Sequence, residues 1–309
     1  RMVYSSEKIK SKARELGFLQ VGVAKARQLD KEARNLERWL KQGMHGEMSY
    51  MENYYEKRID PTLLFPGCKS VIMLALNYFP ENQYIHKEGI KISRYAYGQD
   101  YHQVIKSKLK VLTHWLNDTY GNIQLRYFVD SAPVLERDWA KISGISWSGK
   151  NTLSIHPKHG SYFFLACVLT DIEFQVDHPI NDHCGTCTRC IEACPTDAIH
   201  AQGYIVDASR CISYLTIELK NDIPESFSGK TKGWIFGCDI CQEVCPWNRF
   251  AKQHQVDEFE PKVELLNLSQ QDWLAMTDEA FNEITLNSPI QRTKLKGMKR
   301  NVMYCIDKT

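Results

Sequence analysis

Eight of the eleven cysteines in this chain of 309 residues lie between Cys184 and Cys245. The sequence opens without a recognisable export signal, so we expect a cytoplasmic protein whose cysteines stay reduced. Cysteines clustered in a reducing compartment are more typical of metal ligands than of disulfides. The fold must therefore bring thiolates together around metal.

Two runs of cysteines share a spacing that ends in Cys-Pro. Their members are Cys184, Cys187, Cys190 and Cys194 in the first run, and Cys211, Cys238, Cys241 and Cys245 in the second. The first run has the complete spacing of bacterial ferredoxins that carry two clusters. The second run repeats it, with its first cysteine displaced upstream. We therefore predict a ferredoxin-like domain with two four-iron four-sulfur clusters.

In this spacing the fourth cysteine of a run binds the other cluster, because the chain has turned into a helix and points away. The crossover predicts one cluster on Cys184, Cys187, Cys190 and Cys245. It predicts the other cluster on Cys211, Cys238, Cys241 and Cys194. The alternative is structural zinc, which paired Cys-x2-Cys motifs also bind. Zinc sites do not need the full four-cysteine run, so the spacing favours clusters.

Composition narrows the remaining classes of protein. Hydrophobic residues make up 43% of the chain and charged residues 25%, which is ordinary for a globular protein. The longest apolar run, residues 161–170, is about half of what a membrane-spanning helix needs, so we expect no membrane association. The net charge is only +2, so any nucleic-acid site must come from local clustering of basic residues.

Periodicity predicts helices that alternate with strands through the first part of the chain. The expected helices cover residues 5–17, 31–42, 101–120 and 133–142, with Pro133 in the first turn of the last one. The expected strands cover residues 19–24, 70–78, 122–129 and 161–170. This order indicates an α/β domain around a largely covered sheet over residues 1–175. We expect the cysteine region over residues 176–250 and a short helical segment with a basic tail over residues 251–309, giving an α+β protein overall.

The first domain contains no common cofactor motif: G-x-G-x-x-G, a Walker loop and H-E-x-x-H are all absent. Asp130 follows a predicted strand, and in open α/β sheets ligands gather at such ends. A buried aspartate there can act as a general acid if its pKa is raised. Equally, Asp130 can simply cap the next helix. The aromatic, glycine-rich loops 94–98 and 146–151 either line a large planar ligand or form ordinary turns.

Two neighbouring clusters conduct electrons, so the chain needs an electron acceptor. The α/β domain is the expected place for it. The alternative is a ferredoxin-type electron-transfer module without catalysis. Against this alternative, some 175 residues precede the clusters, which is far more than a carrier requires.

Five stretches are shared with a known family. They are residues 127–137 (YFVDSAPVLER), 149–153 (GKNTL), 156–161 (HPKHGS), 210–218 (RCISYLTIE) and 237–248 (GCDICQEVCPWN). With them the chain resembles the epoxyqueuosine reductases, from about residue 5 to residue 303. Ordinary ferredoxins lack the stretch at 210–218, so the resemblance is specific.

The resemblance implies an enzyme that uses cobalamin and two four-iron four-sulfur clusters. Its implied reaction reduces epoxyqueuosine to queuosine at the wobble position of tRNA with a GUN-type anticodon. The first domain is implied to be a nitroreductase-like cobalamin-binding domain. Asp130 matches the family's aspartate in the Val-Asp-Ser-Ala-Pro motif and is thereby implied as the proton donor. Cobalamin contacts are implied for Arg58, Tyr95, Asp130, Trp147, Lys150, Ser154 and Ser213.

The resemblance also suggests a sequence of events and, besides tRNA, an electron-donating partner. A reduced flavodoxin or ferredoxin-type carrier would deliver electrons singly, and the clusters would relay them to cobalt. Low-valent cobalt would engage the epoxide at carbon or at oxygen, while Asp130 protonates the departing oxygen. No D-x-H-x-x-G motif is present, so we expect base-off cobalamin without that histidine ligand.

The end of the sequence is basic. Its cationic residues are Arg292, Lys294, Lys296, Lys299, Arg300 and Lys308. Such a cluster suits contacts with tRNA phosphates, although most charge runs are solvated helix faces. Many relatives continue with a helical-repeat extension that this sequence lacks, so we expect a smaller tRNA footprint.

One rival enzyme class uses the same cofactors. A reductive dehalogenase-like enzyme would act on a small organohalide. Those proteins are usually exported with a twin-arginine signal, which this sequence lacks. A basic tail would also have no purpose for a neutral substrate.

Overall fold

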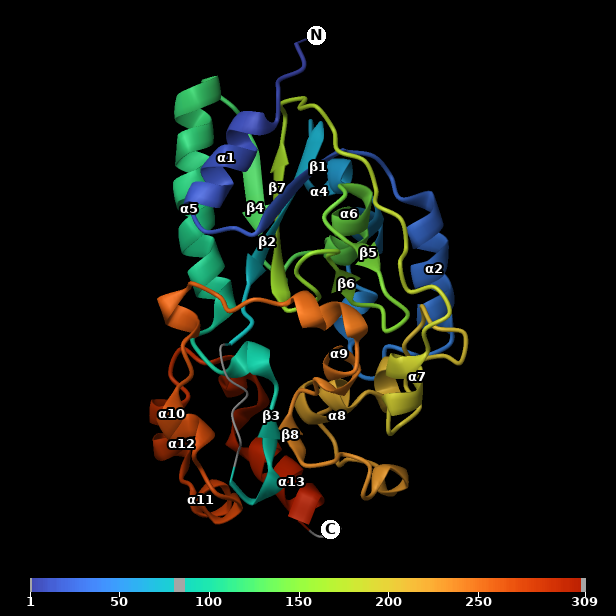
Figure 1. The fold of residues 1–309 in the computed structure, drawn as a ribbon, viewed down its shortest axis with the longest axis vertical. Helices are drawn as coiled ribbons and strands as arrows, with labels where there is room; N and C mark the ends of the chain where they lie inside the picture. Colours follow the sequence, from blue (N-terminus) through green and yellow to red (C-terminus); the bar gives the residue numbers. More distant parts are fainter. Residues whose placement is uncertain (1, 81–86, 307–309) are drawn as a thin grey trace.

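The computed structural model describes residues 2–80 and 87–306 and has a mixed α+β architecture. One part is built around a four-stranded sheet, and the cysteine region and the last helices lie together beyond one end of that sheet (Figure 1). The first helix, α1 (Glu7–Glu15), and the last helix, α13 (Lys294–Ile306), lie toward opposite ends of the molecule.

The central sheet has the strand order β1-β2-β7-β4. Its strands are β1 (Gln20–Lys25), β2 (Ser70–Asn77), β7 (Phe163–Thr170) and β4 (Leu125–Phe128). All four strands expected from the sequence are confirmed, although β4 is shorter than the expected stretch. Each neighbouring pair is antiparallel. The ligand position typical of open sheets with parallel strands therefore does not apply here, and the place of Asp130 has to be explained by its own contacts.

Alternating side chains of the strands enter two separate cores because successive residues point to opposite faces. On one face, Ile72, Leu74 and Leu76 pack against α1 (Glu7–Glu15) and α5 (Tyr101–Tyr120). On the other face, Val71, Met73 and Ala75 pack against Trp139 and Ala140 of α6 (Glu136–Ile142). Figure 1 shows these helices on opposite sides of the sheet. The sheet is thus covered on both faces, as the interleaved pattern predicts.

The first residues of α5 and α6 belong to the candidate site described below. The Asp100 carboxylate accepts a hydrogen bond from the backbone N–H of His102 at 3.0 Å, so α5 begins at Tyr101 as expected. The start of α6 differs from the expectation. Pro133 lies before the helix, in a tight loop where the Val134 N–H donates to the Ala132 carbonyl. That loop occupies the residues that would have formed the first helical turn.

The remaining elements are short, apart from α2 and α13. Between the strands lie α2 (Asp30–Lys41), α3 (Tyr55–Ile59), α4 (Pro61–Leu64) and the small hairpin of β5 (Trp147–Ser148) and β6 (Ser154–Ile155). The cysteine region contains α7 (Arg189–Ala193), α8 (Ile212–Ile217) and α9 (Ile240–Glu243). It is followed by α10 (Val263–Leu266), α11 (Gln270–Ala275), α12 (Asp278–Ile284) and α13 (Lys294–Ile306).

A further core joins segments that are distant in sequence. Strand β3 (Lys91–Ile92) pairs in parallel with β8 (Trp234–Phe236). Ile92 packs in one cluster with Trp273 and Met298 from the last helices. Residues 90–97 thus belong to the packing of the C-terminal half, and the division at residues 175 and 250 stays a prediction. Within the described ranges, no helix is both long and apolar enough to cross a bilayer.

Candidate functional site

The clustered thiols lie in two groups of neighbours. In the first group, burial and then the thiols of Cys184, Cys245 and Cys187 raise the pKa of Cys190 to about 11. Burial also raises the pKa of Cys245, and Cys184 and Cys187 are again among its neighbours. Cys245 thus neighbours the first three cysteines of the first run, which are distant from it in sequence.

The second group contains the other four cysteines. Burial raises the pKa of Cys211, with Cys194 as the neighbouring thiol. Burial likewise raises the pKa of Cys238, followed by the charges of Cys211 and Cys241. Cys241 in turn has Cys194 and, from the first group, Cys190 as neighbours. The two groups adjoin each other, and the assignment of each group to one cluster stays a prediction.

Each group supplies four thiols, a donor set that a metal centre can use. Structural zinc would need four ligands at about 2.0–2.3 Å from one ion. A cubane is larger and is held by four thiolates around it. The donor set of each group therefore fits a four-iron four-sulfur cluster.

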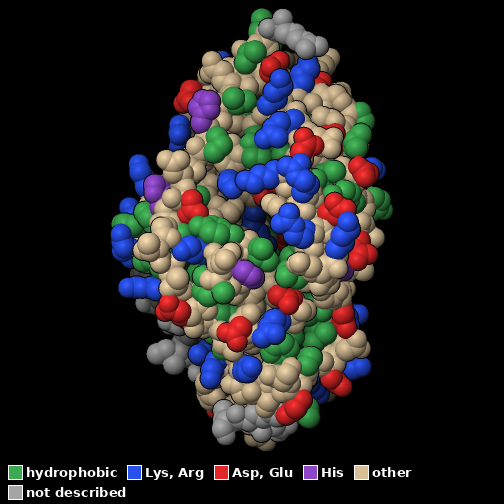
Figure 2. All heavy atoms as spheres, turned by 90° about the vertical axis from the view of Figure 1, so that its right-hand side faces the viewer, with side chains coloured by type: hydrophobic (Ala, Val, Ile, Leu, Met, Phe, Trp, Pro, Cys, Tyr) green, Lys and Arg blue, Asp and Glu red, His purple; other side chains and the backbone are tan. Residues whose placement is uncertain are grey.

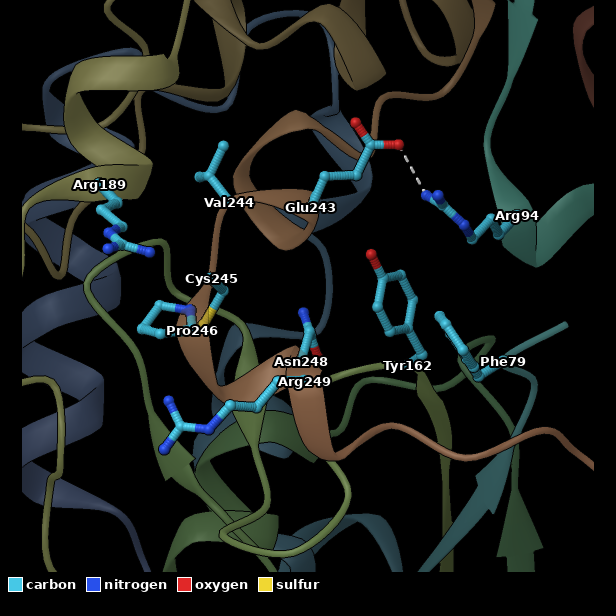
Figure 3. Close-up of a pocket in the computed structure, with 10 residues that line it drawn as sticks. All are labelled: Phe79, Arg94, Tyr162, Arg189, Glu243, Val244, Cys245, Pro246, Asn248 and Arg249. Carbon is cyan, nitrogen blue, oxygen red and sulfur yellow. Dashed lines mark hydrogen bonds and ion pairs between the residues drawn. The ribbon is translucent and has the colours of Figure 1, made fainter. Parts of the chain in front are cut away.

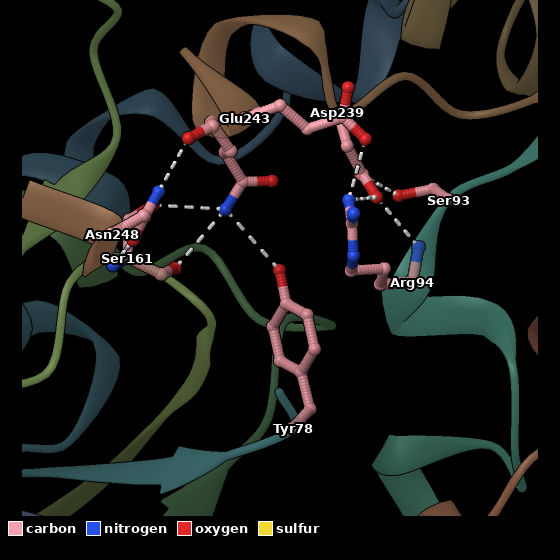
Figure 4. Close-up of polar contacts among 8 residues, drawn as sticks. Tyr78, Ser93, Arg94, Ser161, Asp239, Glu243 and Asn248 are labelled. Atoms are coloured by element: carbon pink, nitrogen blue, oxygen red, sulfur yellow. Dashed lines mark hydrogen bonds and ion pairs between the residues drawn. The ribbon is translucent and has the colours of Figure 1, made fainter. Parts of the chain in front are cut away.

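The second cysteine run is anchored to one end of the central sheet. The Gln242 side-chain amide donates to the Ser161 hydroxyl at 3.1 Å, and the Ser161 N–H donates to the Asn248 side-chain oxygen at 2.7 Å. Gln242 also reaches the Tyr78 hydroxyl, at 3.5 Å (Figure 4). Tyr78 follows β2 and Ser161 precedes β7, so both mark the same sheet end. The cysteine loop at 238–245 is therefore held against this end.

A buried ion pair fixes the same loop from another side. Asp239, next to Cys238, is 1% exposed and accepts hydrogen bonds from the Ser93 hydroxyl and the Arg94 backbone N–H. The Arg94 guanidinium pairs with Asp239 at 3.2 Å and with Glu243 at 2.8 Å (Figure 4). Every charge in this network has a partner, which is the condition for burying charge at tolerable cost.

Asp130 lies at the same end of the sheet, two residues after β4. The Tyr101 hydroxyl donates to its carboxylate at 2.5 Å, and His102 Nε2 lies 3.7 Å from the same oxygen. The backbone of Asp130 has a φ of +55°, a left-handed conformation that aspartate and asparagine tolerate better than most residues. The side chain is 53% exposed. The carboxylate is thus held by α5 while half of it stays open to a ligand.

The charge of Asp130 acts on the pKa of three further side chains, those of Tyr95, Arg292 and Tyr50, and a fourth residue, Glu218, pairs with Arg292. Burial raises the pKa of Tyr95, and Asp130, Arg292 and Glu218 are the next influences on it. Arg292 pairs with Glu218 at 2.8 Å, and the charges of Tyr50 and Asp130 also act on it. The centroids of the Tyr95 and Phe236 rings are 6.0 Å apart, and Phe236 is two residues before Cys238. Tyr95 therefore lies between the acid and the second group of thiols.

Glu136 supports the loop that carries Asp130. Its carboxyl oxygen accepts the backbone N–H of Asp130 at 3.1 Å. Burial, followed by the charge of Asp130, raises the pKa of Glu136 to about 8 from its ordinary 4.5. No sequence pattern singles out Glu136, because its role depends on the turn that brings Asp130 back to it.

This shift predicts a pH dependence of stability. Between about pH 4.5 and pH 8, the folded protein keeps a proton on Glu136 that the unfolded chain has released. The free energy of unfolding should therefore fall as pH rises across this interval. Glu136→Gln keeps an accepting oxygen but cannot titrate, so its curve should be flatter there. Chemical denaturation of both proteins at a series of pH values measures the difference, and parallel curves would contradict the prediction.

Three of the residues expected to contact cobalamin have buried polar atoms without a partner in the described structure. They are Arg58 Nε, Trp147 Nε1 and Ser154 Oγ, in side chains that are 8%, 1% and 7% exposed. A native protein rarely leaves such atoms unpaired, so we expect each one to bind a ligand or a water molecule. Arg58 donates to the Tyr50 carbonyl at 2.9 Å, which places it beside a residue on which the charge of Asp130 acts. Ser213 follows Cys211 closely, and its N–H is directed at that thiol.

Two of the expected contacts, Trp147 and Lys150, lie against the first cysteine run. Lys150 Nζ donates to the backbone carbonyls of Gly185 at 2.7 Å and Cys187 at 2.9 Å. The Trp147 indole neighbours Cys184 and lowers the pKa of that thiol, which burial raises. The loop 146–151 thus serves the cysteine region, a placement that the sequence did not indicate.

A cavity of about 560 Å³ opens beside the first group of thiols. Cys245 and Pro246 form part of its wall, with Arg189 and Arg249 nearby (Figure 3). Arg94 extends toward Glu243 on the other side of the cavity. One thiol group therefore borders a hollow with cationic walls.

The residues expected to contact tRNA have different surroundings, and their role stays a prediction. Arg300 donates to the backbone carbonyls of Leu215 at 2.9 Å and Leu219 at 2.7 Å, so it caps the end of α8. The charge of Asp130 acts on Arg292, as described above. Lys294 and Lys296 are exposed and Lys299 is half-buried, while Lys308 lies outside the described residues. Figure 2 shows that lysines and arginines also gather around a hollow on one side of the molecule.

Several residues at this site are not recognisable from sequence patterns. Tyr101 has a usable signal, because it directly follows the helix-capping Asp100. Tyr50 and Glu218 have none, since only the fold brings them to Asp130. The same holds for Arg94 and Asp239, which are joined across the two halves of the sequence.

Two family models match this chain. Residues 58–131 match the family described as Epoxyqueuosine reductase QueG, DUF1730. Residues 183–248 match the 4Fe-4S double cluster binding domain. The second match covers all eight clustered cysteines.

Relatives extend this similarity to nearly the whole chain. An epoxyqueuosine reductase from Cellulophaga algicola is 53% identical over 300 residues, which are 97% of each chain. One from Leadbetterella byssophila is 52% identical over 299 residues, again 97% of each chain.

Solved structures agree in fold. A crystal structure of epoxyqueuosine reductase with an epoxyqueuosine-modified tRNA-Tyr stem loop has a TM-score of 0.90 and 32% identity, covering 97% of this chain and 80% of that one. The enzyme from Bacillus subtilis, in a structure with its catalytic aspartate loop swung out of the active site, has a TM-score of 0.89 and 31% identity at the same coverage.

Proposed function

This chain belongs to the epoxyqueuosine reductase family, and on that premise we propose that it reduces epoxyqueuosine in tRNA to queuosine, with Asp130 as proton donor. The observation that carries the proposal is one shared location. Asp130 and the cysteine loop at 238–245 lie at the same end of the central sheet, with Tyr95 between them. An acid and an electron source are thereby brought to one substrate.

The residues around Asp130 suit cobalamin. Bound there, cobalamin would supply a low-valent cobalt that reduces the substrate. Arg58 Nε and Ser154 Oγ would find partners among its amide or phosphate groups. Tyr95 and Ser213 would connect its site to the second group of thiols. The nitroreductase-like character of the sheet domain is part of the same proposal.

Asp130 would act on the oxygen that leaves the opened epoxide. A neutral carboxylic acid next to that oxygen removes the charge that would otherwise develop as alkoxide. Tyr101 fixes the carboxyl group by its hydrogen bond. Protein atoms leave half of the Asp130 side chain exposed, so the cofactor and the base would complete its enclosure.

The contacts suggest an order for the electron path. Cys245 borders the cationic cavity, and Cys190 adjoins Cys241 of the second group. Phe236, close to Cys238, contacts Tyr95, on which the charge of Asp130 acts. Electrons would therefore enter at the first group of thiols and leave from the second.

A reduced flavodoxin or ferredoxin-type carrier would dock over the cavity beside Cys245. Arg189 and Arg249 would attract an acidic carrier there. The rate with the carrier should then fall steeply as ionic strength rises, because exposed charges are screened. The rate with dithionite should change much less. Equal salt dependence for both reductants would contradict docking at this surface.

The tRNA substrate would present its wobble base to Asp130. Unpaired anticodon bases can be turned out of their stack, as reaching an enclosed site requires. Exposed Lys294 and Lys296 would contact phosphates, and Arg292, on which the charge of Asp130 acts, would meet the base or its backbone near the acid. Arg300 is committed to capping α8, so we assign it a structural role.

The direct test uses protein reconstituted with iron, sulfide and cobalamin. We expect resolved corrin absorption bands in addition to broad iron–sulfur absorption. With a reductant, the protein should convert an epoxyqueuosine-containing stem loop to the queuosine form, measured by mass spectrometry of its nucleosides. A ferredoxin-type module would bind no cobalamin. A dehalogenase-like enzyme would bind cobalamin but leave the stem loop unchanged.

A further inference from the structure

The loop between β5 and β6 packs against the first cysteine run, although it precedes that run in the sequence. Lys150 Nζ is within hydrogen-bond distance of two carbonyls of that run, those of Gly185 and Cys187. Two hydrogen bonds hold this ammonium group among the ligand-bearing residues. Its positive charge is therefore fixed in place and not free to move with solvent.

The path of the Lys150 side chain is itself prepared by the fold. A Cβ atom at Gly203 would lie 2.6 Å from Lys150 Cγ, and Gly203 has a φ of +76°. The next residue, Tyr204, donates its backbone N–H to the Lys150 carbonyl at 2.8 Å. Glycine at 203 thus leaves the space through which the lysine reaches the cysteine run.

Trp147 approaches the same run with a different group. Its side chain is 1% exposed, and its indole nitrogen has no conventional hydrogen-bond partner in the described part of the chain. Cys184 is a neighbour of this indole: burial raises the pKa of the thiol, and Trp147 lowers it. The Trp147 ring is held by edge contacts, with ring centroids 5.1 Å from His183 and 5.0 Å from Trp247. A buried N–H group beside sulfur stabilises negative charge on that sulfur.

One negative charge opposes these two groups. Asp182 accepts the Cys184 backbone N–H at 2.7 Å and the Tyr204 hydroxyl at 2.5 Å. The carboxylate therefore lies beside the same end of the run. Cluster potentials depend on nearby charge and on hydrogen bonds to the sulfurs. Adding an electron makes a cluster more negative, so a fixed cation and an N–H donor favour reduction, and a carboxylate opposes it.

We propose that Lys150 and Trp147 are tuning residues that raise the midpoint potential of the cluster bound by Cys184, Cys187, Cys190 and Cys245, against the opposing charge of Asp182. The inference rests on the proposed function for that cluster. In the step concerned, the reduced carrier loses one electron and this cluster gains it, with no bond made or broken. The loop 146–151, which belongs to the sheet domain, thereby sets how easily this cluster is reduced.

The experiment is a spectroelectrochemical titration of the reconstituted protein, without cobalamin or tRNA. We expect Lys150→Gln and Trp147→Phe each to lower the midpoint potential of this cluster. Asp182→Asn should raise it. A removed charge-assisted contact should change the reduction equilibrium roughly tenfold, which is about 59 mV for one electron. The other cluster should shift less and serves as an internal reference.

Two controls separate tuning from folding. Lys150→Arg keeps the charge and should keep the potential, and Lys110→Gln removes an exposed charge on α5 and should change nothing. Intact clusters with unchanged potentials in Lys150→Gln and Trp147→Phe would overturn the proposal. If Lys150→Gln fails to hold iron, Trp147→Phe and Asp182→Asn decide, and the absence of opposite shifts refutes it. Because no substrate is present, these outcomes are independent of whether the protein acts on epoxyqueuosine.

Discussion

Asp130→Asn should reduce turnover of epoxyqueuosine about 10²- to 10⁴-fold, the usual contribution of a positioned general acid. Asparagine is nearly the same size and tolerates the left-handed backbone at φ +55°, so the loop should keep its shape. It can still accept the Tyr101 hydrogen bond but has no acidic proton to give. Single-turnover assays on a modified stem loop measure the effect.

The variant has to retain its cofactors for this result to be meaningful. Iron content and corrin absorption should match those of the wild-type protein. Tyr101→Phe provides a matched control, because it removes only the hydrogen bond that positions the carboxylate. We expect a smaller loss for it than for Asp130→Asn. Turnover by Asp130→Asn within a few-fold of wild type would remove the proton-donor role.

Loss of either cluster should stop turnover altogether, and the pattern of loss tests the crossover. Cys194→Ala should lose the same cluster as Cys241→Ala, although Cys194 belongs to the first run. Cys245→Ala should lose the same cluster as Cys187→Ala. Each variant should keep about half of the iron, because the matching family carries two clusters of equal size.

Electron paramagnetic resonance of the reduced proteins identifies which cluster remains. The spectra should sort the variants into the two pairs above. Cys305→Ala is the control, since this cysteine lies on α13 and contacts Thr231. It should keep both clusters and full activity. Spectra that pair Cys194 with Cys187 would show that each run binds its own cluster.

Residues close in sequence account for what was predicted correctly. The spacing of the eight cysteines was sufficient to predict a domain that binds two four-iron four-sulfur clusters, which the family match over residues 183–248 confirms. The apolar patterns located the four strands of the sheet, and Asp100 marked the start of α5. These signals succeed because hydrophobic periodicity and capping act within a few residues.

Other features were not predicted, because a turn or a contact between distant residues determines them. The loop at Asp130 displaced the start of α6 from Pro133 to Glu136. Strand direction was not readable from alternation, because antiparallel neighbours are set by connections across the fold. The sequence also did not indicate that Arg300 donates hydrogen bonds to carbonyl groups at the end of α8, while its contact with tRNA stays a prediction.

The sequence by itself determined the iron–sulfur chemistry, the covered sheet and Asp130 as a candidate acid. Only the tertiary structure decided which groups surround that acid. It also decided that Lys150 and Trp147 lie beside the first cysteine run. The reason is physical: ligand spacing and periodicity are properties of a local stretch of chain. The meeting of Tyr95, Arg292 and Asp130, or of Lys150 and Gly185, depends instead on how whole elements pack, and packing is settled by the chain as a whole.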